Sequence, residues 1–118
     1  MKIYVDIDDT ICYREDKSNL DYNKSIPLPE KIAKINQLYD QGHEIYYWTA
    51  RGTSTRINWL IPTQNQLDSW GCKYHGIKVF KPNYDLFICD KALNSINEWD
   101  KIDDFVNENY FKKKIKCF

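Results

Sequence analysis

Short apolar runs alternate with longer amphipathic stretches along this chain. Four runs are rich in β-branched and aromatic residues and predict strands, at residues 2–5, 43–48, 77–80 and 86–89. Between the first two, apolar residues recur at the spacing of a helix face, namely Ile32, Ile35, Leu38 and Tyr39. A strand, a helix and a second strand in this order favour parallel pairing. The pattern therefore predicts an α/β fold with a parallel sheet flanked by helices.

Proline and glycine mark where the predicted helices begin and end. Pro29 suits the first turn of one helix, and Gly42 suits its C-terminal cap. A second helix is predicted between residues 57 and 70, with Ser54 or Thr55 as its cap and a start or a kink at Pro62. Further helices are predicted at residues 92–99 and 102–111. Residues 11–25 are polar without a helical stripe, which predicts an excursion over the surface.

Two carboxylates stand two residues apart where the first predicted strand ends. Asp6 and Asp8 follow the run at residues 2–5, and ligands of open α/β sheets bind beyond the carboxyl ends of the strands. Carboxylates this close repel each other unless a cation lies between them or one of them holds a proton. Mg²⁺ fits this position, because it is a hard ion that takes oxygen ligands and often bridges to phosphate.

The run D-x-D-x-T at residues 6–10 resembles the first motif of the haloacid dehalogenase (HAD) superfamily of phosphatases and phosphotransferases. The second motif of that family is a Ser or Thr that ends the next strand, and Thr49 fits it. The third is a Lys, matched by Lys81, and the fourth is an acidic residue after a further strand, matched by Asp90. All four motifs occur in the family's order, each after a strand-like run.

The resemblance implies a three-layer Rossmann-like HAD-type fold, with a small flap hairpin at about residues 11–25 and no cap domain. It implies that Asp6 is the nucleophile and that Asp8 is the general acid and base, with the backbone carbonyl of Asp8 on Mg²⁺. Thr49 and Lys81 would bind the phosphoryl group, and Asp90 would complete the metal site with Asp6. Asp9 and Thr10 are expected to shape the turn of the first motif.

Arg51 is the candidate for substrate recognition, because its planar fork suits a carboxylate or a second phosphate. A surface salt bridge is the alternative for this residue. The fourth motif departs from the pattern of short relatives, which carry two adjacent acids there, whereas Cys89 precedes Asp90 here. Asp90 keeps the metal if the second acid is the direct ligand, and metal binding weakens if the first one is.

Composition agrees with one domain over residues 1–118. Seventeen basic residues balance 17 acidic ones, so the chain has no excess charge that would favour binding to nucleic acid or to a membrane. The four cysteines do not have the spacing of a metal site or a disulfide framework. The sequence begins with a predicted strand, so we expect no secretory leader, and no apolar run is long enough to span a bilayer. We therefore expect a cytoplasmic protein with reduced thiols. The lysines at residues 112–116 are expected to form a solvated tail.

The sequence as a whole predicts a Mg²⁺-dependent phosphomonoester hydrolase that works through an aspartyl-phosphate. The chain is similar to small capless HAD proteins associated with capsular or other surface-polysaccharide biosynthesis, which implies a small phosphorylated metabolite such as a sugar phosphate. Two alternatives remain open. One is a phosphatase of a polynucleotide or protein, and the other is a non-catalytic phosphate-binding domain whose metal site has decayed. The oligomeric state does not follow from the sequence.

Overall fold

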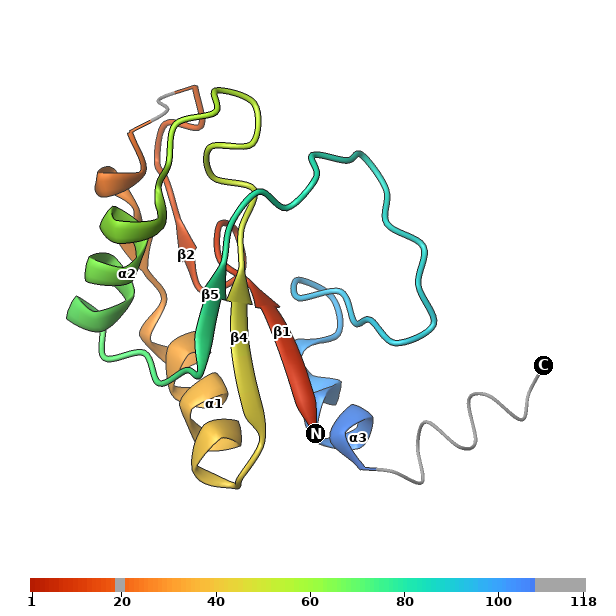
Figure 1. Ribbon diagram of the computed structural model, residues 1–118. Helices are drawn as coiled ribbons and strands as arrows, with labels where there is room; N and C mark the ends of the chain where they lie inside the picture. Colours follow the sequence, from red (N-terminus) through yellow and green to blue (C-terminus); the bar gives the residue numbers. More distant parts are fainter. Residues whose placement is uncertain (19–20, 108–118) are drawn as a thin grey trace. The chain divides into compact units, whose positions relative to one another are not determined.

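A computed structural model describes residues 1–18 and 21–107 of the chain (Figure 1). The chain divides into two units, Met1–Asn83 and Tyr84–Phe118. The lysine tail, Cys117 and the last part of the helix predicted at residues 102–111 lie outside the described residues.

The first unit is built on a three-stranded parallel sheet, in the order β1 (Lys2–Asp6), β4 (Glu44–Trp48) and β5 (Gly76–Lys78) (Figure 1). Side chains alternate between the two faces of each strand, as the pleat requires. Val5, Ile45 and Tyr47 are buried on one face, whereas Tyr4 on the other face remains exposed. The predicted parallel β-α-β order is confirmed.

Helices α1 (Pro29–Asp40) and α2 (Leu60–Ser69) connect the three strands. Both connections step in the same direction across the sheet, from β1 to β4 and from β4 to β5. Right-handed crossovers in one direction place both helices on the same face, as Figure 1 shows. Their buried side chains include Ile32, Ile35 and Leu38 from α1 and Thr63 and Leu67 from α2.

The ends of α1 match the sequence prediction. Pro29 is its first residue, and Gly42 takes a positive φ of 96° beyond its last turn. The amide of His43 donates to the carbonyl of Leu38 at 3.2 Å, which closes the helix as a Schellman motif does.

The start of α2 differs in part from the prediction. Pro62 lies in the first turn, where its missing N–H costs nothing. The predicted cap at Ser54 or Thr55 is wrong, because residues 51–55 form a turn well before the helix. Asn58 satisfies the first turn instead, since its Oδ1 accepts from the amide of Leu60 at 2.9 Å.

The predicted flap contains a short antiparallel hairpin, formed by β2 (Cys12–Tyr13) and β3 (Ile26–Pro27). A 3₁₀ turn, η1 (Tyr22–Lys24), precedes β3 and is capped by Asp21, which accepts from the amide of Asn23 at 3.0 Å. The hairpin is tied to the start of α1 by a bond from the amide of Leu28 to the carbonyl of Ile11 at 2.8 Å.

The second unit contains η2 (Trp99–Lys101) and α3 (Ile102–Val106) among its described residues. The strand predicted at residues 86–89 is wrong, because this segment is irregular and leaves Leu86 and Ile88 exposed by 75% and 86%. An apolar run forms a strand only when a neighbour completes its ladder of hydrogen bonds.

The helix predicted at residues 92–99 is also wrong. The side chain of Asn94 accepts from the amides of Ile96 and Asn97, at 2.9 and 3.0 Å, and this local turn competes with a helix. The described chain is an α/β fold on a parallel sheet, and the finer three-layer HAD-type arrangement stays a prediction. No helix among the described residues has the length and apolar character to cross a membrane.

Candidate functional site

The carboxyl ends of the three parallel strands meet at the same level of the sheet. Asp6 pairs in register with Trp48, and Trp48 pairs with Lys78. The amide of Thr49 donates to the carbonyl of Lys78 at 2.9 Å, which continues the ladder by one step. The predicted residues that follow these strands in the first unit are therefore brought to one edge.

Asp6 and Lys81 form an ion pair at this edge, with Nζ 3.5 Å from Oδ1. The Lys81 side chain is 14% exposed and the Asp6 side chain 42%. The backbone of Lys81 is fixed on both sides, because its amide donates to the carbonyl of Thr49 at 2.9 Å and its carbonyl accepts from the hydroxyl of Thr53 at 2.7 Å. Local anchoring thus aims the lysine at the aspartate.

Burial raises the pKa of the Asp6 carboxyl above its ordinary value, and the negative charge of Asp8 adds to this rise. The Lys81 ammonium and a bond from the amide of Ile7 act in the opposite direction. Because the side chain keeps part of its surface in water, the solvent moderates the effect of burial. The Asp6 carboxylate thus lies partly in water beside the Lys81 ammonium, and burial and the cation act on its pKa in opposite directions.

Asp8 is bound by the guanidinium of Arg51 through two parallel hydrogen bonds. Nε donates to Oδ2 at 3.0 Å and Nη2 donates to Oδ1 at 2.9 Å. The Arg51 side chain is 1% exposed, whereas that of Asp8 is 25% exposed. The sequence motif placed these residues near each other, but it did not indicate that they bind directly.

The turn between Asp6 and the flap is held by its own backbone. The amides of Thr10 and Ile11 both donate to the carbonyl of Ile7, at 3.1 and 3.0 Å. Asp9 takes a φ of 63°, a left-handed conformation that Asp tolerates better than most residues, and its amide donates to the carbonyl of Cys12 at 2.9 Å. The expected turn-shaping role of Asp9 is thus confirmed by its backbone geometry.

Thr49 is 1% exposed, and its hydroxyl oxygen accepts from the amide of Arg51 at 3.1 Å. A hydroxyl that accepts one hydrogen bond keeps its own O–H to donate. The loop that follows depends on Gly52, whose φ of 85° and close approach to the carbonyl of Ile57 leave no room for a side chain.

Sequence reasoning missed the polar side chains that surround Arg51. Its Nη1 donates to Oγ1 of Thr63 at 3.2 Å and to Oε1 of Gln66 at 2.7 Å. Both come from α2 and lie three residues apart on one helix face, directly before the buried Leu67. Two polar residues on the helix face that packs against the core could have indicated that this face binds a buried charged side chain.

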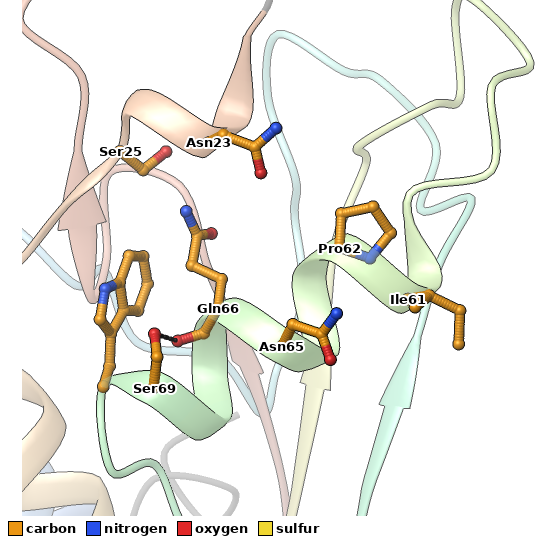
Figure 2. A pocket seen from close by; sticks show the side chains of 8 residues that line it. Asn23, Ser25, Ile61, Pro62, Asn65, Gln66 and Ser69 are labelled. Atoms are coloured by element: carbon orange, nitrogen blue, oxygen red, sulfur yellow. Dashed lines mark hydrogen bonds between the residues drawn. The ribbon is translucent and has the colours of Figure 1, made fainter.

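Gln66, which accepts from Arg51, also lines an open hollow between η1 and α2. Figure 2 shows Gln66 reaching from α2 toward Ser25 of the flap. The lining carries no charged side chain and consists of Asn23, Ser25, Ile61, Pro62, Asn65, Gln66, Ser69 and Trp70.

Asp90 belongs to the second unit, where the thiol of Cys89 lies 3.8 Å from its Oδ1. The described residues contain no group of three or more His, Cys, Asp or Glu side chains that could hold a metal. The metal role of Asp90 therefore stays a prediction.

Neither a family model nor a curated protein matches this chain. Among solved structures, it is similar to the crystal structure of a target protein from Vibrio cholerae, which is described without a function. The two share 25% sequence identity with a TM-score of 0.77, over 96% of this chain and 98% of the other. This similarity supports the α/β fold over nearly the whole chain.

Proposed function

We propose that this protein is a Mg²⁺-dependent phosphomonoester hydrolase of the HAD type that works through an aspartyl-phosphate at Asp6. The observation that carries the proposal is the Asp6–Lys81 pair, at 3.5 Å, on the edge of the sheet where Asp8 and Thr49 also lie. A carboxylate, a fixed cation, a second carboxylate and a hydroxyl can together supply the nucleophile, the charge neutralisation and the proton transfers of phosphoryl transfer through a covalent intermediate.

Each group has a role in the proposed reaction. Asp6 attacks phosphorus and displaces the alcohol, while the Lys81 ammonium reduces the repulsion between the two anions. Asp8 is paired with Arg51 as a carboxylate, so it would first take up a proton from solvent, give it to the leaving oxygen, and then take one from the water that hydrolyses the aspartyl-phosphate and return it to solvent. Thr49 keeps an O–H that can donate to a phosphoryl oxygen. The reaction returns every residue to its starting state.

The donor set at this edge suits Mg²⁺. Asp6 offers a partly exposed carboxylate, and Mg²⁺ is usually bound through one or two carboxylates, water and substrate phosphate. Asp8 is different, because both of its carboxylate oxygens already accept from Arg51, so its contribution would be the backbone carbonyl. Asp90 would be the second carboxylate. When bound, the ion would supply positive charge to the phosphoryl oxygens.

The substrate class in this proposal is a small phosphorylated metabolite, such as a sugar phosphate of surface-polysaccharide biosynthesis. The resemblance of the motifs supports it, and the balance of 17 basic against 17 acidic residues speaks against a polynucleotide substrate, which would favour a basic groove. The cytoplasmic location also belongs to the proposal, since widely spaced cysteines favour reduced thiols.

Hydrolysis of p-nitrophenyl phosphate, with Mg²⁺ and after its removal by a chelator, tests the proposal. Wild-type turnover should require Mg²⁺, and Asp6→Asn should abolish it. Asp40→Asn is the matched control, because Asp40 is an exposed acid at the end of α1 and pairs with Lys73. Acid-quenched protein should carry one phosphoryl group on the peptide that contains Asp6.

Two results would contradict the proposed reaction. Absence of Mg²⁺-dependent turnover, combined with binding of inorganic phosphate, would identify a non-catalytic phosphate-binding domain. Turnover that survives Asp6→Asn would exclude the aspartyl-phosphate route. A panel of phosphorylated metabolites, with a phosphopeptide and a 5′-phosphorylated oligonucleotide beside them, would separate small from macromolecular substrates.

A further inference from the structure

We propose that Arg51 is a positioning residue that couples the flap and α2 to the acid/base Asp8. This inference rests on the proposed function, because it assigns to Arg51 control over a group of that same site. The sequence offered Arg51 as a substrate-binding residue, and the geometry of its side chain points to a different task.

The donors of Arg51 are all occupied inside the protein. A guanidinium has five N–H groups in a rigid fork. Nε and Nη2 bind the two oxygens of Asp8, and Nη1 binds Thr63 and Gln66. The remaining N–H of Nη2 faces the hydroxyl of Ser25 at 3.4 Å and the thiol of Cys12 at 3.9 Å. Arg51 therefore has no donor left to offer to a substrate.

Two contacts from α2 fix the orientation of the guanidinium plane. Thr63 is fully buried and accepts from Nη1 at 3.2 Å, and Gln66 accepts from the same nitrogen at 2.7 Å. A bidentate pair transmits orientation, because both oxygens of the carboxylate must follow the fork. Rotation of Arg51 would therefore rotate Asp8.

The flap reaches the same guanidinium from the other side. The ring of Tyr22 lies 4.8 Å from Cζ of Arg51 in a cation–π contact. Gln66 joins the two elements, since its Nε2 donates to the carbonyl of Tyr22 at 2.9 Å while its Oε1 accepts from Arg51. The position of η1 is thus linked through Gln66 and Arg51 to Asp8.

This linkage predicts a kinetic signature that depends on the leaving group. General acid catalysis matters most for an alkyl phosphate, whose alkoxide is a poor leaving group, and little for p-nitrophenyl phosphate. If Arg51 acts through Asp8, then Arg51→Lys should repeat the pattern of Asp8→Asn. We expect a loss in kcat/KM of about 10–100-fold for the alkyl ester, by analogy with the cost of misplacing a catalytic group by an ångström. The loss for the aryl ester should be several times smaller.

The double variant Asp8→Asn with Arg51→Lys isolates the coupling. Once the acid/base is gone, a residue that only positions it should have no further effect, so the two losses should not add. Equal losses for both esters, with a raised KM, would show that Arg51 binds substrate. Additive losses would likewise overturn the positioning role.

Variants on the two flanking elements keep the proposal testable if Arg51→Lys fails to fold. Gln66→Met and Tyr22→Leu leave the Arg51–Asp8 pair present, and each removes one contact with Arg51, from α2 and from the flap respectively. Both should lower kcat/KM more for the alkyl ester than for the aryl ester. Gln64→Met is the matched control on the exposed face of α2 and should change neither. Wild-type levels for all three variants would overturn the linkage, whereas an inactive wild-type protein would overturn the proposed function and this inference together.

Discussion

The ammonium of Lys81 lies 3.5 Å from the carboxylate of Asp6, although the flap, α1, β4, α2 and β5 lie between the two residues in the sequence. The parallel register of β1, β4 and β5 brings them to one edge. The pair makes the charge state of Asp6 depend on two opposed effects, burial and a neighbouring cation.

The first prediction concerns the titration of Asp6 in metal-free protein. Burial raises the pKa of this carboxyl and Lys81 lowers it, so Lys81→Met should raise the pKa further. Carboxyl ¹³C NMR of the two proteins measures the midpoints directly. Lys73→Met serves as the control, because Lys73 is an exposed lysine paired with Asp40. An unchanged or lower Asp6 midpoint in Lys81→Met would contradict the electrostatic account.

The same shift has a consequence for stability. The folded chain holds the Asp6 proton more tightly than the unfolded chain, so the contribution of this group is fully present below its unfolded pKa. It is lost as the pH rises through the folded pKa. Asp6→Asn should therefore be more stable than wild type at neutral pH, and the difference should disappear in acid. Urea unfolding at both pH values measures this change.

Much of this edge could be predicted from the sequence, because parallel strands end together. An acidic residue, a threonine and a lysine after successive apolar runs must meet if those runs pair in parallel, and Asp6, Thr49 and Lys81 do so. Helix ends at Pro29 and Gly42 were equally predictable, because their backbone constraints are local.

Other features depend on partners that local sequence does not specify. The local sequence of an arginine after a strand is the same whether the side chain faces water or a buried carboxylate. The buried position of Arg51 depends on Thr63 and Gln66, which accept its hydrogen bonds from the next helix. Residues 86–89 have strand-forming side chains, but strand formation also needs a neighbour, which the run itself does not encode.

The second prediction concerns Gly52, which follows Arg51 in the loop. Gly52→Ala should lower the free energy of unfolding by at least about 2 kcal/mol, since a left-handed backbone and a collision with the carbonyl of Ile57 act together. Gly42→Ala separates the two causes. Gly42 has a φ of 96° but no atom within 4 Å of the added methyl, so only the backbone cost of about 1 kcal/mol applies. Similar losses of unfolding free energy for the two variants would show that the loop shifts and removes the collision with Ile57.

The third prediction concerns Asp9 at its φ of 63°. Asp9→Gly should change the free energy of unfolding by less than about 0.5 kcal/mol, because relief of the left-handed conformation offsets the extra entropy of the unfolded chain. Asp9→Val should cost about 2 kcal/mol at the same position, where a β-branched side chain is strongly disfavoured. Loss of the contact with Lys17, an exposed pair 3.7 Å apart, contributes little in either variant. Denaturant unfolding distinguishes the two variants, and equal losses would show that the side chain of Asp9, rather than its backbone, holds the turn.

The fourth prediction tests whether Asp90 supplies a metal ligand despite the Cys89 that precedes it. If it does, Asp90→Asn should raise the Mg²⁺ concentration that gives half-maximal turnover by at least about tenfold, the lower range for damage to a metal site. Asp85→Asn is the matched control, because Asp85 is an exposed acid of the same unit at the other end of the segment at residues 86–89. Calorimetric titration of Mg²⁺ into both variants checks that the change is in binding.

Cys89→Asp should lower the half-maximal Mg²⁺ concentration if an acid at this position supports Asp90 as a ligand. Equal Mg²⁺ dependence of wild type and Asp90→Asn would instead assign the ion to Asp6, the backbone at Asp8 and the substrate phosphate alone.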